Sequence, residues 1–166
     1  MQKILEVIFR NLDQWIESEN SQRRQDGGFA LPKCEVKLLG QMSLLANTKV
    51  VATLSLVGTV DMDAKLEKMD HAIKRKMIEL LKANNLVYDE DSEKIWLPTG
   101  SRFETLFKLK TLKVSIVDPE SALVSKAVKA KEKNKLLIQE AIASDSFPNL
   151  VDRIQANGGD LNFFVE

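Results

Sequence analysis

The hydrophobic positions near the N-terminus repeat with the period of an α-helix. Apolar residues recur at three- and four-residue spacing from Ile4 to Ile16, with polar and charged residues between them. This spacing places the apolar side chains on one face and predicts an amphipathic helix over residues 1–20. The polar, glycine-containing stretch at residues 19–28 then ends the helix and leads the chain across the surface.

Alternating, β-branched residues are clearest in KVVATLSLVGTVDMDA, residues 49–64. This composition, without proline, predicts one strand, or two short strands with Gly58 as a bulge between them. LVYDEDSEKIWL, residues 86–97, predicts a hairpin with an acidic turn. TLKVSIVD, residues 111–118, predicts a further strand, and residues 161–166 predict an edge strand.

The order of the predicted elements is helix, strands, helix, strands, helices. This order is typical of a mixed α/β (α+β) fold, a small mixed sheet with helices packed on it. No internal repeat or linker divides the chain, so residues 1–166 are predicted to form one domain, with C-terminal helices within residues 119–157. A helix or a turn is predicted to start near Gly40, and further helices are predicted over 65–85, over 119–144 with Pro119 in the first turn, and over 147–159.

Composition fits an ordinary globular domain of 166 residues, 44% of them apolar and 29% charged. Lysine plus arginine and aspartate plus glutamate balance at 24 each, so the chain has no overall basic field. This balance argues against nucleic acid as the main partner and leaves only a local basic patch open.

Cys34 is the only cysteine, which excludes an intramolecular disulfide and a cysteine-rich zinc site. Charged residues come too early for the apolar core of a signal peptide. No apolar run approaches the roughly 20 residues that span a bilayer. These features predict a cytoplasmic protein with no membrane partner.

Asp61 and Asp63 stand one residue apart at the end of the predicted strand over residues 49–64. Residues two apart on a strand point to the same face, so the two carboxylates are expected side by side. Two carboxylates so placed could hold Mg²⁺ that bridges to the phosphates of a nucleotide. An alternating strand with one solvent-exposed face gives the same pattern, and the motif alone leaves both interpretations open.

The order of three motifs resembles the nucleotidyltransferase superfamily in its minimal, single-domain bacterial forms, which include toxin and antitoxin components. The motifs are a glycine turn, LLGQMSLLA at residues 38–46, and the aspartate pair in GTVDMDA at residues 58–64. The third is LKVSIVDPESALVSKAVKAKEKN, residues 112–134. The likeness extends from Leu38 to Ile142.

This resemblance implies a nucleotidyltransferase-like fold and Mg²⁺-dependent transfer of a nucleotidyl group from a nucleoside triphosphate to a hydroxyl. Asp61 and Asp63 would bind Mg²⁺ or Mn²⁺ and act as the catalytic carboxylates. Gly40 and Gln41 would lie in the nucleotide-binding turn, and Lys126 would steady the phosphates. The strand over residues 111–118 is expected beside the Asp61–Asp63 strand, where the superfamily carries a third carboxylate.

Three positions depart from the superfamily pattern. Ser115 stands where the third carboxylate is expected, Gln41 replaces the second small residue of the turn, and Val57 replaces a common arginine. A serine supplies neither a base nor a charge for the metal. These departures support a second hypothesis, a catalytically inactive binding or regulatory protein with a protein partner, as in a two-protein toxin–antitoxin system.

Overall fold

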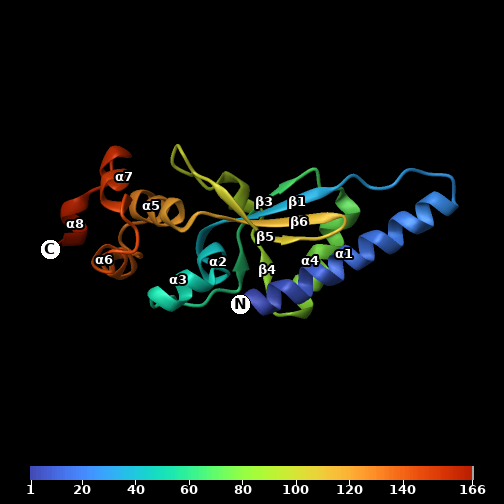
Figure 1. Ribbon diagram of the computed structural model, residues 1–166, viewed down its shortest axis with the longest axis horizontal. Helices are drawn as coiled ribbons and strands as arrows, with labels where there is room; N and C mark the ends of the chain where they lie inside the picture. The colour runs from blue at the N-terminus through green and yellow to red at the C-terminus, as the bar shows by residue number, and fades with distance from the viewer. Residues whose placement is uncertain (166) are drawn as a thin grey trace.

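The computed structural model describes residues 1–165 as a central sheet with helices packed beneath it and gathered at one end (Figure 1). The chain ends lie on different parts of the molecule, the N-terminus at the start of α1 and the C-terminus beside α8 (Figure 1). The helices are α1 (Gln2–Gln25), α2 (Gly40–Leu45), α3 (Thr48–Thr53), α4 (His71–Ala83), the 3₁₀ helix η1 (Glu90–Lys94), α5 (Pro119–Lys129), α6 (Lys135–Ala143), α7 (Leu150–Ala156) and α8 (Leu161–Val165). The strands are β1 (Cys34–Leu38), β2 (Asp61–Met62), β3 (Ala64–Glu67), β4 (Val87–Tyr88), β5 (Phe103–Lys108) and β6 (Leu112–Val117).

The main sheet has the strand order β3-β1-β6-β5, and β2 and β4 form a separate two-stranded ladder. Strand β1 pairs in parallel with β6 and antiparallel with β3, so the sheet is mixed. The predicted α/β class is therefore confirmed. The strand over residues 111–118 is expected beside the strand of Asp61 and Asp63. This expectation is wrong, because β1 lies between β6 and β3, the strand that follows Asp63.

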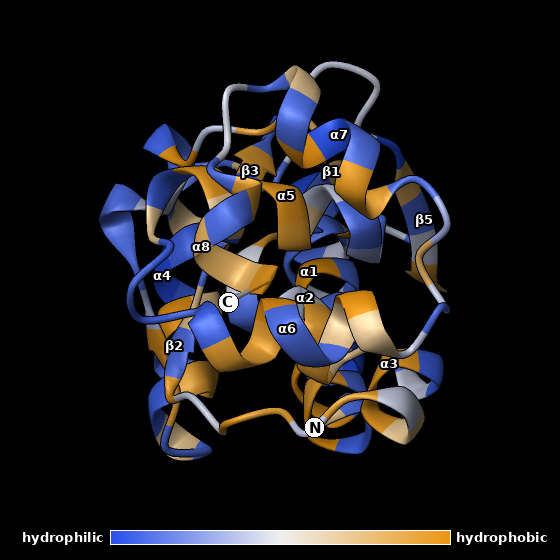
Figure 2. Ribbon diagram, turned by 90° about the vertical axis from the view of Figure 1, so that its left-hand side faces the viewer, coloured by the Kyte–Doolittle hydropathy of each residue, from blue (hydrophilic) through white to orange (hydrophobic). Residues whose placement is uncertain are grey.

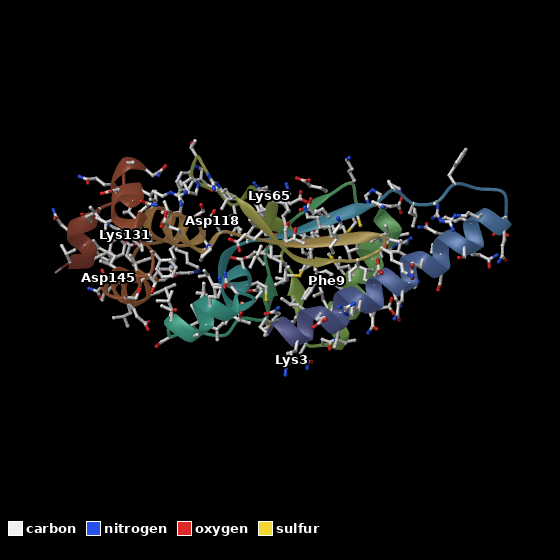
Figure 3. All side chains as sticks on the ribbon, viewed as in Figure 1. Lys3, Phe9, Lys65, Asp118, Lys131 and Asp145 are labelled. Atoms are coloured by element: carbon white, nitrogen blue, oxygen red, sulfur yellow. The ribbon has the colours of Figure 1, made fainter. Side chains whose placement is uncertain are left out.

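One apolar core lies between the sheet and the pair α1 and α4. It includes Leu5, Phe9 and Leu12 from α1 and Val36 and Val114 from the sheet, all almost fully buried. Phe9 and Lys65 lie on opposite sides of the sheet (Figure 3). The periodic apolar face predicted for the N-terminal helix is thus the face that packs, and the helix continues to Gln25.

A second apolar cluster lies among helices α5 to α8, with contributions from α2 and α3. Seen from this end, the helices alternate between hydrophilic and hydrophobic stretches (Figure 2). Helix α2 belongs to both clusters, because Met42 packs in the first and Leu44 in the second. The short segment that begins at Gly40 is therefore held from two sides.

The strand predicted over residues 49–64 is largely replaced by helix α3 and an irregular loop. The side chain of Asn47 accepts hydrogen bonds from the backbone N–H groups of Lys49 and Val50, at 3.1 and 3.4 Å. This N-cap, together with burial of Val50, outweighs the β propensity of the segment. Strand structure appears only from Asp61, and the break between β2 and β3 falls at Asp63 rather than Gly58.

The other differences also come from tertiary contacts. The predicted helix over 65–85 begins only at His71, because residues 64–67 pair with β1 and Asp70 caps the helix. The predicted helix over 119–144 is two helices, α5 and α6.

Three further differences concern strands. The predicted hairpin over 86–97 is strand β4 followed by η1. Strands β1 and β5 have no counterpart among the predicted strands. Helix α8 replaces the edge strand predicted over 161–166, whose last residue lies outside the described range. Among residues 1–165 no helix has the length and apolarity to cross a membrane.

Candidate functional site

Asp61 and Asp63 project on the same side of the chain, as their spacing predicts. Asp61 is exposed, Met62 is fully buried in the core, and Asp63 is partly buried. This alternation is that of a strand with one packed face. Both aspartates line a cleft of about 660 Å³ between the sheet and helix α5.

A third carboxylate, from Asp89, reaches the same cleft, and sequence reasoning missed it. Strand β4 pairs in parallel with β2, with Asp61 opposite Val87 and Met62 opposite Tyr88. The Asp89 N–H donates to the Met62 carbonyl oxygen at 3.1 Å, which brings Asp89 beside Asp63. An aspartate directly after the apolar run LVY was the available signal, because parallel strands present their carboxyl ends at the same edge.

Ser92 fixes the segment that carries Asp89. Its fully buried hydroxyl accepts a hydrogen bond from the Ala64 N–H at 2.9 Å and lies 2.6 Å from the Asp89 carbonyl oxygen. The Asp89 side chain accepts from the Asp91 N–H at 2.9 Å and so caps η1. These bonds attach η1 to the edge of β3 and hold Asp89 against the aspartate pair.

The carboxyl group of Asp63 lies near those of Asp89 and Asp61. Burial, interaction with the carboxyl group of Asp89, and the charges of Asp89 and Asp61 raise the pKa of Asp63 from 3.8 to about 6, while Lys126 acts in the opposite direction. The neighbouring carboxylates therefore disfavour ionisation of Asp63. A cation in the cleft would relieve this repulsion.

Gly40 is required by the position of Asp63. Its φ of +55° lies in the left-handed region, and a Cβ at this position would lie 2.6 Å from Asp63 Oδ2. The Leu39 N–H also donates to the Asp63 carbonyl oxygen at 2.9 Å. The glycine of the LLGQMSLLA motif thus makes room for a carboxylate at the start of α2.

Lysines form the wall of the cleft that faces the carboxylates. Lys126 of α5 and Lys133 of the following loop both line it. Burial and, next, the nearby charge of Lys133 lower the pKa of Lys126, and the charge of Asp63 partly opposes them. The two ammonium groups repel each other, and so do the carboxylates that line the same cleft. A ligand that brings both a negative group and a cation would relieve both repulsions.

An apolar wall completes the cleft, formed by Ile95, Trp96 and Leu97 after η1. The Ser125 hydroxyl donates to the Trp96 carbonyl oxygen at 2.7 Å, which attaches this wall to α5. The Lys129 ammonium lies 5.1 Å from the centre of the Trp96 ring. Polar groups at one end and an apolar wall at the other are usual for a small-molecule site.

Ser115 does not belong to the cleft, so its assignment as the position of the third carboxylate is wrong. It is 1% exposed on β6, and its hydroxyl donates to Glu35 Oε2 at 2.6 Å. Asp118 is also elsewhere: its carboxylate caps α5 by accepting from the Ser121 N–H at 2.9 Å. Gln41 does line the cleft, but its side-chain amide donates to the Val57 carbonyl oxygen at 2.7 Å.

The donors in the cleft suit a hard divalent cation, because Mg²⁺ and Mn²⁺ prefer carboxylate, water and phosphate oxygens. Within residues 1–165, however, no three His, Cys, Asp or Glu side chains are gathered closely enough to form a metal site by themselves. Asp61, Asp63 and Asp89 therefore fit such an ion in chemistry, and further oxygen ligands have to come from water and a bound phosphate.

Comparison of the chain with protein-family models, curated protein sequences and solved structures finds no match in any of the three. The likeness to nucleotidyltransferases therefore remains a prediction from the motifs between Leu38 and Ile142.

We expect Gly40→Ala to destabilise the protein by at least about 1–2 kcal/mol, the usual cost of a left-handed conformation for a residue with a Cβ. The added methyl group also has to displace the Asp63 carboxylate. Gly58→Ala is the matched control, since a Cβ there meets nothing within 4 Å. Denaturant unfolding of the two variants measures the difference, and equal stabilities would contradict the proposed close contact.

Asp63 should make stability depend on pH. Its folded-state pKa of about 6 exceeds the unfolded value of 3.8, so the folded protein retains a proton that the unfolded chain releases. The free energy of unfolding should therefore fall as pH rises from about 4 to about 6, with the full cost present at higher pH. Two pKa units correspond to about 3 kcal/mol, and solvent in the open cleft should reduce this to about 1–2 kcal/mol.

Asp63→Asn tests this dependence, because asparagine has nearly the same size and shape as aspartate and never ionises. The variant should melt several degrees higher than the native protein near pH 7.5, at about 2–4 °C per kcal/mol, and show no advantage near pH 4. Asp91→Asn is the control, since Asp91 is exposed and outside the cleft. A pH-independent difference would argue against an ionising Asp63.

Ser115→Asp should destabilise the protein and bring no gain in metal binding. The new carboxylate would be buried next to Glu35, at a cost of at least about 2 kcal/mol. Thermal unfolding with and without Mg²⁺ measures both effects. A Mg²⁺-dependent rise in melting temperature in this variant, larger than that of the native protein, would place Ser115 at the metal after all.

Proposed function

We propose that the cleft binds a nucleoside triphosphate with Mg²⁺ and transfers its nucleotidyl group to a hydroxyl. The observation that supports this most is the opposition of the carboxylates of Asp61, Asp63 and Asp89 to the ammonium groups of Lys126 and Lys133 across one cleft. A triphosphate with a divalent cation carries the complementary pair of charges. The apolar wall around Trp96 offers a surface for the nucleoside.

In this proposal Lys126 and Lys133 bind phosphate oxygens, and Asp61 and Asp63 bind the cation. Mg²⁺ bound there would supply positive charge next to the phosphate that is attacked. Asp89 accepts the proton of the acceptor hydroxyl. The hydroxyl oxygen then bonds to the α-phosphorus of the nucleotide as pyrophosphate leaves. Asp89 thus takes the role that the resemblance implies for the position of Ser115.

A second candidate function is binding or regulation without catalysis, with a protein partner as in a toxin–antitoxin-like pair. It is favoured by the lack of a preassembled metal-ligand group within residues 1–165. The Gln41 side chain, bonded to Val57 at the edge of the cleft, adds to this case because it stands where a small residue is usual.

Calorimetric titration with ATP, CTP, GTP and UTP, each with and without Mg²⁺, tests nucleotide binding. We expect at least one nucleotide to bind and Mg²⁺ to strengthen its binding. Mg²⁺ or Mn²⁺ with nucleotide should also raise the melting temperature, with about 2.7 kcal/mol of stabilisation at a hundredfold excess over the dissociation constant. Lys126→Gln should weaken nucleotide binding with or without metal, whereas Asp61→Asn should remove the effect of Mg²⁺.

Asp91→Asn again serves as the matched control and should bind as the native protein does. No heat of binding with any nucleotide, in either metal condition, would rule the proposal out. Asp89→Asn separates the two candidate functions: loss of transfer from α-labelled nucleotide with binding retained indicates catalysis. A biological effect that survives both Asp61→Asn and Asp89→Asn indicates the binding protein.

A further inference from the structure

A concentration of positive charge lies at the end of the sheet opposite the cleft. A hollow of about 300 Å³ there is lined by five lysines. They come from three separate places: the residue before β1, the residue after β3, and the hairpin of β5 and β6. They are Lys33, Lys68, Lys108, Lys110 and Lys113.

All five lysines are exposed, and most of their charge is not compensated. Lys110 pairs with Glu17 at 3.4 Å, and Lys113 lies 4.0 Å from Glu35. Among residues 1–165, Lys33, Lys68 and Lys108 make no ion pair. The carboxylate of Glu67, which also lines the hollow, is already bound by Lys37 at 2.7 Å.

An exposed aromatic residue, Phe29, lies in the loop between α1 and β1. Lys33 and Lys110 also line a neighbouring hollow, together with Arg24 and Ala30. Phe29, the residue before Ala30, is 91% exposed. A phenyl ring so exposed gains little from folding, and Phe29 directly precedes a residue that lines the neighbouring basic hollow. This combination suggests a ligand with both negative charge and flat apolar groups.

We propose that this end of the sheet binds single-stranded nucleic acid, with phosphates held by the lysines and an unpaired base stacked on Phe29. Basic grooves with an adjacent aromatic platform bind single strands without sequence preference. A membrane surface fits less well, because it requires several exposed apolar side chains, and at this end Phe29 is the exposed large one within residues 1–165. The basic surface consists of Arg24, Phe29, Lys33, Lys68, Lys108, Lys110 and Lys113.

The basic surface and the cleft that contains Asp63 are connected by one strand. Asp63 directly precedes β3 and Lys68 directly follows it, so the two are separated by about 16 Å at the usual rise of a strand. In Figure 1 the start of β1, the end of β3 and the turn between β5 and β6 lie at the end of the sheet away from α5 to α8. The proposed binding surface does not depend on nucleotidyl transfer, and it can be tested without nucleotide or metal.

Fluorescence polarisation with labelled single-stranded RNA and DNA of about 12 nucleotides, within the range of known site sizes, measures the binding. The key variant is Lys33→Gln/Lys68→Gln/Lys108→Gln, which removes the three unpaired lysines. The matched control is Lys3→Gln/Lys49→Gln/Lys82→Gln, which removes three exposed lysines elsewhere and gives the same net charge. Circular dichroism and melting temperature verify that both variants are folded.

We expect the native protein to bind both single strands and to lose affinity as salt increases. Three lost phosphate contacts should reduce the slope of log K against log salt by about 2, at roughly 0.7 per contact. The control variant should keep the native slope. Phe29→Ala should weaken binding by about fivefold or more and leave the slope unchanged, because stacking releases no counterions.

Three results would overturn the proposal. The first is no binding of either single strand at low salt. The second is an equal loss of affinity in the key variant and the control, which would show only an effect of net charge. The third is binding to vesicles of anionic lipid, or to duplex DNA, that is as tight as binding to the single strands.

Discussion

The approach of the Asp63 carboxylate to the backbone at Gly40 is the contact on which the candidate site depends. A Cβ at residue 40 would lie 2.6 Å from Asp63 Oδ2, and the Leu39 N–H is bonded to the Asp63 carbonyl oxygen at 2.9 Å. The contact joins the end of β1 to the break between β2 and β3. Helix α2, which begins at Gly40, packs in both apolar clusters, so neither side of the contact can move without disturbing a core.

Charge is distributed unevenly in a chain that has no net charge. Carboxylates gather at one end of β3, two lysines face them from α5 and the loop after it, and further lysines gather at the other end of the strand. Each group keeps like charges together, which costs folding free energy that a ligand of opposite charge would recover. The overall balance of acidic and basic residues therefore says little about the local fields that select ligands.

The third carboxylate of the cleft lies on a different segment from the one that the resemblance to nucleotidyltransferases implies. The resemblance implies the strand around Ser115, but β1 separates that strand from β3. Asp89 fills the place because β4 pairs in parallel with β2, and Ser92 fastens the following turn to Ala64. The acidic segment that reads as a hairpin turn is instead a 3₁₀ helix capped by Asp89.

Features that depend on near neighbours in the chain can be predicted from the amino-acid sequence alone. Helical periodicity identified α1 and most of α4, Pro119 marked the start of α5, and the spacing of Asp61 and Asp63 placed both on one face. These follow from backbone geometry over a few residues. Contacts between distant parts of the folded chain bring Asp89 to the aspartate pair, make α3 of a β-prone segment capped by Asn47, and gather Lys33, Lys68 and Lys108 on one surface. Such outcomes depend on which distant strands pair and which side chains find partners, and local periodicity carries no information about either.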